Sequence, residues 1–369
     1  MPIFEKLSEY RYEQLVFCHD GATGLRAVIA IHDTTLGPAL GGCRMWPYPT
    51  EEEALVDVLR LARSMTYKAA ASGLNLGGGK SVIIGDPRSD KSEALFRSFG
   101  RYIETLGGRY IVSEDVGTSA EDLENIRVET SHVAGVDVTH GGSGAPSPAT
   151  ALGVTQGIRA CVEEVFGTPS LDGVTVAVQG LGNVGYLLCQ LLHEEGANLV
   201  VADVNPAVVE RVTHDFGATK AVEPDEILSF DCDVFAPCAL GSVVNDDTIS
   251  ELRCSIIAGS ANNVLAEDRH GQALAERGIL YAPDYVINAG GLINVADELE
   301  GYNKDRAIKR VSRIYDSVKQ IIAISKRDGV PTNVAADTLA LERRDAIGSM
   351  ERLHTGHPYG RLYRRRETL

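Results

Sequence analysis

Apolar residues near the middle of the chain follow a strand period first and a helix period directly afterwards. Val174 to Val178 form a short apolar run that ends just before Gly180. The next segment places apolar side chains at the i, i+3, i+4, i+7 and i+8 positions of one helix face: Val184, Leu187, Leu188, Leu191 and Leu192. A second apolar run, 198–202, then ends on Asp203. The pattern predicts a strand, a helix and a second strand, which make a complete βαβ unit.

The first loop of this unit carries glycines at G-x-G-x-x-G spacing, which is specific only because a strand precedes it and a helix follows. Gly180 allows the tight turn, Gly182 lets backbone N–H groups approach a pyrophosphate, and Gly185 lets helix and strand pack closely. We therefore expect a dinucleotide to bind this loop, that is, Gly180, Leu181, Gly182, Asn183, Val184 and Gly185. Asp203 can accept a hydrogen bond from a ribose 2′-hydroxyl and would repel a 2′-phosphate, so the sequence favours NAD over NADP.

The rest of the chain alternates strand-like and helix-like segments and predicts an α/β fold. Strands are expected at 12–18, 25–31 and 109–113, and helices after Thr50, over 92–106 and after Ser119. The glycine-rich segment 37–44 is interpreted as a loop, and 304–326 as one amphipathic helix. The segment 140–148 has the composition of a hinge, with Ser147 expected to cap the next helix. A length of 369 residues favours two domains.

Composition narrows the class of protein. The net charge of −16 argues against nucleic acid or an anionic membrane as a partner. No apolar run approaches the length of a membrane span, and the N-terminus lacks the apolar region of a signal peptide. The seven cysteines are scattered without a C-x-x-C pair, which favours reduced thiols and a cytoplasmic location. The nine histidines show no ligand spacing, so no metal site is predicted.

Two lysines are candidates for chemistry. The stretch that ends Gly79-Lys80-Ser81 resembles a phosphate-binding P-loop, but Leu74 stands where that motif needs glycine, and Lys80 is expected to open a strand. Lys68 and Lys80 could face one cleft, where a second ammonium group or desolvation lowers the pKa of one of them and makes it a usable base. Asp115, at a strand end, could pass protons. The alternative is that both lysines are ordinary solvated residues.

Motifs along most of the chain resemble the amino-acid dehydrogenase family that includes the glutamate, leucine, valine and phenylalanine enzymes. The resemblance covers residues 1 to about 340. It is carried by HDTTLGPALGG from His32, MTYKAA from Met65, LNLGGGK from Leu74, EDVGT from Glu114, VAVQG from Val176, FAPCALG from Phe235 and YAPDYVINAGG from Tyr281.

The resemblance implies roles for residues that spacing alone leaves open. It implies that Lys80 is the general base that activates water and that Asp115 moves a proton to or from the amine. Lys68 and an asparagine of the Asn262/Asn263 pair would hold the substrate carboxylate and amine. Three residues would line the same pocket: Gly41, Gly42 and Met65. Four more are expected along the cofactor: Thr150 and Asn288 at its nicotinamide end, and Ala239 and Leu240.

The implied reaction is reversible NAD-dependent oxidative deamination of a branched-chain L-amino acid. By alignment with the family, the substrate side chain would meet Leu40, Ser113, Leu292 and Val295, three of which are branched and apolar. Such a pocket favours leucine and also accepts valine and isoleucine. The alternatives are a valine, phenylalanine or glutamate dehydrogenase, or a nucleotide-binding regulator without catalysis, against which the presence of Lys80 and Asp115 speaks.

The resemblance also implies the domain order and the assembly. The first domain, 1–146, would bind substrate, carry the catalytic residues and serve in oligomerisation, and the second, 147–330, would be a Rossmann-type NAD domain. The segment 331–369 would return to the first domain, with a mobile cleft between the two. The family assembles as homo-oligomers, with an octamer favoured here. The basic end of the chain, 361–366, is interpreted as a solvated terminus.

Overall fold

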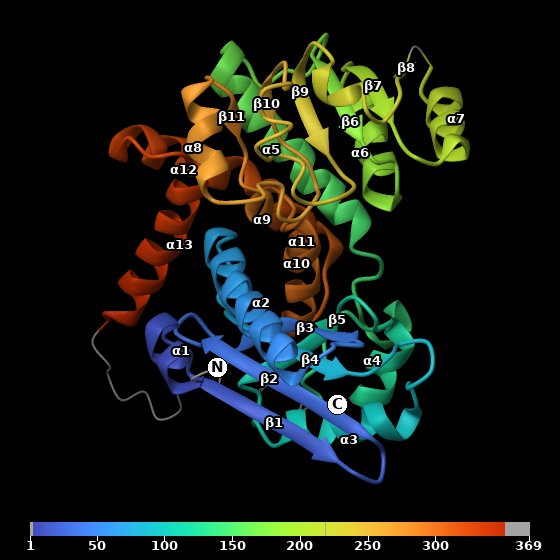
Figure 1. Cartoon of the computed structure of the whole chain (residues 1–369), viewed down its shortest axis with the longest axis vertical. Coiled ribbons are helices and arrows are strands. Elements are labelled where there is room, and N and C mark those ends of the chain that lie inside the picture. The colour runs from blue at the N-terminus through green and yellow to red at the C-terminus, as the bar shows by residue number, and fades with distance from the viewer. Residues whose placement is uncertain (1–2, 218, 351–369) are drawn as a thin grey trace.

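The protein has two α/β domains, each built on its own sheet (Figure 1). The structure is a computed structural model that describes residues 3–217 and 219–350. The strands of the first domain are β1 (Gln14–Asp20), β2 (Leu25–Asp33), β3 (Ala39–Trp46), β4 (Gly77–Ile84) and β5 (Tyr110–Glu114). Its helices are α1 (Ile3–Tyr10), α2 (Glu51–Ala71), α3 (Glu93–Glu104) and α4 (Ala120–Arg127). The predicted domain boundary at 146 and 147 fits the division between the sheets, and we propose it as the boundary.

The first sheet is mixed and has helices on both faces. Its strand order is β1-β2-β4-β3-β5, with β4, β3 and β5 parallel and β1 and β2 antiparallel at one edge. Val28 and Ala30 of β2 pack with α2, whereas Ile29 and Ile31 pack with α3. Because the two faces of one strand are both buried, its sequence is a nearly continuous apolar run.

The interpretation of 37–44 as a loop is wrong, because most of it belongs to β3, between β4 and β5. Glycines there serve close strand packing. A Cβ added at Gly41 would lie 1.7 Å from the Gly79 carbonyl oxygen. Lys80 likewise does not open a strand after a glycine turn: it lies inside β4, whose first three residues are all glycine. On the other side of β4, a Cβ at Gly78 would lie 2.1 Å from the backbone nitrogen of Thr66 in α2.

The second sheet is entirely parallel and has the doubly wound order β11-β10-β9-β6-β7-β8. Its strands are β6 (Thr175–Gln179), β7 (Asn198–Ala202), β8 (Lys220–Ala221), β9 (Cys232–Pro237), β10 (Cys254–Ile257) and β11 (Leu280–Tyr281). The strand order reverses between β6 and β9, which is the place where such folds bind ligands. The predicted βαβ unit is confirmed, because the helix α6 (Asn183–Glu194) joins β6 to β7.

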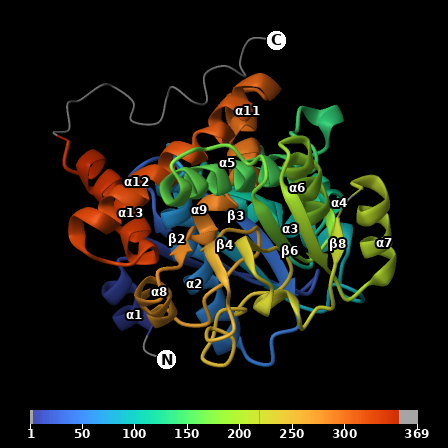
Figure 2. The same cartoon turned by 90° about the horizontal axis from the view of Figure 1, so that it is seen from above.

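Helices cover both faces of this sheet, and α5 and α12 lie together on one side (Figure 2). The helices are α5 (Ser147–Phe166), α7 (Pro206–Asp215), α8 (Arg269–Glu276), α9 (Asp284–Ile287), α10 (Gly290–Ala296), α11 (Lys304–Ser312), α12 (Ile314–Asp328) and α13 (Thr332–Gly348). Short 3-10 turns are η1 (Val138–His140), η2 (Ile227–Ser229) and η3 (Asp297–Glu300). The prediction of one helix over 304–326 is wrong, because the helix is interrupted at Arg313, between α11 and α12. Ser147 is the first residue of α5 and not its cap; that place is taken by Pro146, without a side-chain hydrogen bond.

The last described helix, α13, joins the two domains. At its start, Thr332 Oγ1 donates to the Tyr281 carbonyl over 2.6 Å, in the second domain. Near its end, Arg343 donates to the Leu74 carbonyl over 2.6 Å, in the first domain. In Figure 1 this helix runs from the upper domain down towards α1. The described part of the segment 331–369 thus contacts both domains, and the basic end at 361–366 lies outside the described residues.

One hydrophobic cluster crosses between the domains. It combines residues of the first domain, such as Leu40, Ala70 and Leu74, with others of the second, such as Val178 and Ile287. Of the helices in the described part of the chain, none is both long and apolar enough to cross a membrane.

Candidate active site

A cavity of about 770 Å³ lies between the domains. Predicted site residues from both domains line it: Met65, Lys68, Lys80 and Asp115 from the first, and Asn262 and Asn263 from the second. These residues are up to 198 positions apart in the chain, from Met65 to Asn263. The fold therefore brings the two predicted catalytic residues and much of the predicted substrate site into one space.

Lys80 and Asp115, which both line this cavity, form an ion pair. The Lys80 Nζ atom lies 2.8 Å from Asp115 Oδ2, and the Lys80 side chain is 7% exposed. Lys80 comes from β4 and Asp115 directly follows β5, on the far side of β3. Gly42 of β3 makes the approach possible, because a Cβ there would lie 2.7 Å from the Cβ of Asp115.

Asp115 stays ionised in spite of its burial. Desolvation is the largest single effect and raises its pKa, but Lys80 and Arg44 together outweigh it and hold the pKa below the ordinary value. Arg44 Nε lies 3.1 Å from Asp115 Oδ2. Sequence reasoning missed Arg44, which lies two residues after Gly42, because the segment was interpreted as a loop.

Lys68 of α2 lines the cavity and forms a hydrogen bond across the domain boundary. Its Nζ donates to Asn288 Oδ1 over 2.6 Å, and Asn288 Nδ2 in turn donates to Asn262 Oδ1 over 2.8 Å. Desolvation lowers the pKa of Lys68 to about 8, with Asp284 opposing the shift and Lys80 adding to it. Asn288, predicted beside the nicotinamide, thus directly contacts two residues predicted to hold substrate.

The four residues predicted for the substrate side chain lie in the first sheet and in α10, outside the lining of the cavity. Leu40 of β3 is buried, and Leu292 and Val295 of α10 pack against the same hydrophobic cluster. Ser113 of β5 is half-buried and pairs with Gly42 across the strands. These residues present apolar groups and one hydroxyl.

The glycine loop lies at the switch point of the second sheet. Gly180 has a φ of +94°, and a Cβ there would lie 2.6 Å from the Cβ of Ala239, which follows β9. A Cβ at Gly185 would lie 2.0 Å from the Gly180 carbonyl oxygen, whereas Gly182 faces open space. A backbone free of side chains on one face of a helix N-terminus fits a pyrophosphate. Asn183 is the first residue of α6.

Asp203 follows β7 and supports the same loop. Its Oδ2 accepts from the Leu181 N–H over 2.7 Å, and its Oδ1 accepts from the Asn205 N–H over 2.8 Å. The other cofactor-site residues are placed as follows: Leu181 is buried, Val184 is half-buried, Leu240 is 81% exposed, and Thr150 Oγ1 donates to the Pro146 carbonyl over 3.0 Å.

One group of metal-binding residue types occurs in the described part of the chain, namely Asp246, Glu267 and His270. The Glu267 N–H donates to His270 Nδ1 over 3.0 Å, so the ring proton is on Nε2, which contacts Asp246 Oδ1 at 3.2 Å. Both ring nitrogens are therefore engaged, and Arg269 pairs with both carboxylates. The group is a hydrogen-bonded network without a free imidazole ligand.

Comparison with known proteins decides the family. The model of the Glu/Leu/Phe/Val dehydrogenase dimerisation domain matches residues 12–132. The Glutamate/Leucine/Phenylalanine/Valine dehydrogenase model matches residues 141–216 and 204–344. The chain belongs to the Glu/Leu/Phe/Val dehydrogenase family. It is an amino-acid dehydrogenase, and the fold and enzyme class expected from the sequence are confirmed.

Curated and solved members of this family are similar over nearly the whole chain. Leucine dehydrogenase of Bacillus subtilis is 59% identical over 97% of this chain and 98% of its own. Leucine dehydrogenase of Geobacillus stearothermophilus is 60% identical over 94% of each chain. The crystal structure of L-tryptophan dehydrogenase from Nostoc punctiforme has a TM-score of 0.85, with 48% identity over 94% of this chain and 99% of its own. Family members with a Rossmann-type domain bind a nicotinamide cofactor, and the glycine loop described above fits one.

Proposed function

We propose that this dehydrogenase catalyses the reversible oxidative deamination of leucine, and also of valine and isoleucine, to the 2-oxo acid and ammonium with NAD. The observation that carries the proposal is the buried Lys80–Asp115 pair, 2.8 Å apart, in a cavity with Lys68 on its wall. Leucine dehydrogenases at about 60% identity support the substrate class.

Each polar residue of the cavity is assigned a separate role in binding or in proton transfer. Lys68, half-buried and cationic, is placed to bind the substrate α-carboxylate, and Asn262 or Asn263 to bind the amine. Lys80 acts as the general base that takes a proton from the attacking water, and Asp115 moves protons to and from the amine nitrogen. Gly41, Gly42 and Met65 leave room beside them. The nicotinamide cofactor supplies the hydride acceptor when it is bound.

Recognition of the side chain is assigned to Leu40, Ser113, Leu292 and Val295 on the resemblance to the family, although these residues lie outside the lining of the cavity. A substrate carboxylate would meet no cation among them and would lose its hydration, which disfavours glutamate. Leu40 occupies the space that an aromatic ring needs, which disfavours phenylalanine. One methylene in such a pocket changes binding by only about 1–3 kcal/mol, so leucine, valine and isoleucine are all accepted.

The cofactor is assigned to the loop of Gly180, Gly182 and Gly185, with Ala239, Leu240, Thr150 and Asn288 beside it. Asp203 is fixed by two backbone N–H groups, and its carboxylate retains lone pairs for a ribose hydroxyl. A 2′-phosphate at that place would be repelled, which supports NAD.

The enzyme is proposed to assemble as a homo-oligomer, with an octamer favoured, and to work in the cytoplasm. The match of 12–132 to a dimerisation domain supports self-association, and so does the edge strand β1, on which Phe17 is 60% exposed. All seven cysteines are free thiols, which supports a reducing compartment.

The test is the appearance of NADH absorbance with a panel of L-amino acids and saturating NAD, repeated with NADP. Leucine, valine and isoleucine should give the highest kcat/KM, with phenylalanine and glutamate far lower, and NADP should support little activity. A preference for glutamate or phenylalanine would mean that the protein has the specificity of another member of the family. Equal rates with NADP would contradict the proposed role of Asp203 in cofactor choice.

A further inference from the structure

A second layer of charged groups lies behind the Lys80–Asp115 pair. Arg44 Nε contacts Asp115 Oδ2 at 3.1 Å, and Arg44 Nη1 contacts Asp57 Oδ2 at 2.8 Å. Arg44 is placed for both contacts because its strand, β3, lies between β4 and β5. Lys80, Asp115, Arg44 and Asp57 therefore form a row in which positive and negative charges alternate.

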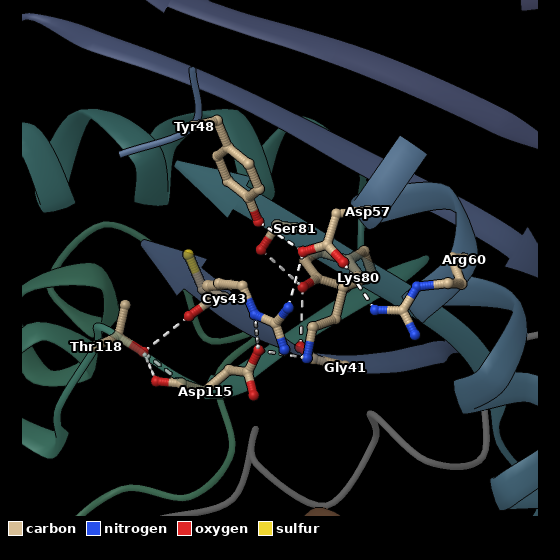
Figure 3. Close-up of polar contacts among 11 residues, drawn as sticks. Gly41, Cys43, Tyr48, Asp57, Arg60, Lys80, Ser81, Asp115 and Thr118 are labelled. Atoms are coloured by element: carbon tan, nitrogen blue, oxygen red, sulfur yellow. Dashed lines mark hydrogen bonds and ion pairs between the residues drawn. The ribbon is translucent and has the colours of Figure 1, made fainter. Parts of the chain in front are cut away.

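Asp57 of α2 fixes the far end of this row. Its carboxylate accepts from Tyr48 Oη over 2.7 Å and from Arg60 Nη2 over 3.0 Å, in addition to Arg44. Figure 3 shows Asp57 between Tyr48 and Arg60, with Lys80 and Asp115 on the other side of the network. The Asp57 side chain is 16% exposed. With three donors on one carboxylate, the guanidinium group of Arg44 is held in one orientation towards Asp115.

We propose that Arg44, anchored by Asp57, is a positioning residue that keeps Asp115 ionised while Lys80 gains and loses its proton. The inference rests on the proposed dehydrogenase function. Asp115 Oδ2 accepts from both cations. When Lys80 is neutral its charge is gone, but a guanidinium group keeps its charge at every working pH.

Four other polar or titratable residues surround the Lys80–Asp115 pair. Lys68 of α2 lies close enough to Lys80 for mutual repulsion. Glu114 precedes Asp115, and desolvation raises its pKa. Beneath the pair, burial raises the pKa of Cys43 to about 12, so this thiol stays neutral, and Thr118 Oγ1 accepts from the Asp115 N–H over 3.0 Å.

The test is the pH profile of kcat for leucine oxidation in the wild type and in three variants. In Arg44→Gln the acidic limb should move to higher pH by about one unit, so that kcat at a pH on that limb falls about tenfold. Arg44→Lys should restore most of the profile. Asp57→Asn should move the limb in the same direction by less, because Arg44 keeps its charge but loses its anchor. Binding of NADH, followed by fluorescence, should not change.

The matched control is Arg127→Gln, which removes an exposed arginine of α4 that pairs with Glu124 at 2.7 Å, a carboxylate that does not line the cavity. Its profile should equal that of the wild type. An unmoved limb in Arg44→Gln, or an equal loss of kcat at every pH, would overturn the inference and leave a purely structural role. If Arg44→Gln does not fold, Arg44→Lys and Asp57→Asn decide. If the wild type prefers another amino acid, the proposed function fails separately, and the same profiles are measured with that substrate.

Discussion

Lys80 is the residue on which the proposed chemistry depends most directly. Lys80→Ala should bind NADH normally but lose turnover by about 10²–10⁴-fold, the usual contribution of a general base. Single-turnover and steady-state assays with leucine and NAD measure the loss. Lys91→Ala is a suitable control, since Lys91 also pairs with an aspartate, Asp122, but outside the cavity. Near-normal turnover of the Lys80 variant would exclude this residue from the mechanism.

Leu40 tests the assignment of the side-chain pocket. Leu40→Gly should raise the ratio of kcat/KM for phenylalanine over leucine, because it removes a buried side chain from β3 where an aromatic ring needs room. The two substrates are compared at saturating NAD. An unchanged ratio would mean that the pocket has been placed wrongly.

His32 makes folding stability depend on pH. Burial lowers its pKa to about 4, and its Nε2 lies 3.0 Å from the Tyr10 carbonyl, which can only accept, so the neutral ring donates there. The unfolded chain takes up this proton near pH 6.5, whereas the folded protein does so near pH 4. The contribution is therefore fully present above pH 6.5 and is lost as the pH falls towards 4, by up to about 3 kcal/mol.

Urea unfolding at pH 7.5 and at pH 5 measures this loss. His32→Asn, which cannot titrate, should flatten the dependence over this interval, although it starts from a lower stability. If the variant and the wild type lose stability in parallel between the two pH values, His32 is not its source.

At the level of elements, the sequence predicted those segments whose pattern is local. The βαβ unit of β6, α6 and β7 was predicted because its strand period, glycine loop and helix period all lie within 30 residues. The capping box of Ser119 and Asp122 is likewise present at the start of α4. By contrast, β3 was missed because glycine is a poor strand former by itself. Its place in the sheet is decided by close contact with β4, which is not encoded in the local pattern.

Helix α13 is anchored to the first domain by Arg343, and loss of this side chain should lower the stability of the protein. Arg343 donates to the carbonyls of Ala70, Gly73 and Leu74 at the end of α2, at 2.6–3.3 Å, and to Asn75. Arg343→Ala should lower the free energy of unfolding by about 2 kcal/mol, because several carbonyls lose a charged donor. Arg327→Ala, which removes exposed pairs with Asp328 and with Glu342 of α13, should lower it by less than about 1 kcal/mol. Equal effects of the two variants in chemical denaturation would contradict this anchoring.

At the scale of the whole molecule, the sequence predicted two domains and which motifs face the cleft, but not the contacts across it. Lys68 and Asn288 are 220 residues apart, and their hydrogen bond depends on how the domains meet. The network of Arg44 and Asp57 depends in the same way on α2 crossing β3. The motifs therefore predicted residues for the reaction, whereas the contacts that hold those residues in place depend on tertiary packing.

The hydrophobic cluster that crosses between the domains should make them unfold together on heating. Ala70 and Leu74 from the first domain, and Ala336 from α13, belong to the same buried set as the core of the second sheet. If one domain unfolded alone, the residues of this cluster in the other domain would become exposed to water. That exposure costs a free energy of about 25 cal/mol for each Å² of apolar surface. In a calorimeter the enzyme should therefore show one endotherm, in which the two domains unfold together. Two resolved endotherms would mean that the domains melt independently.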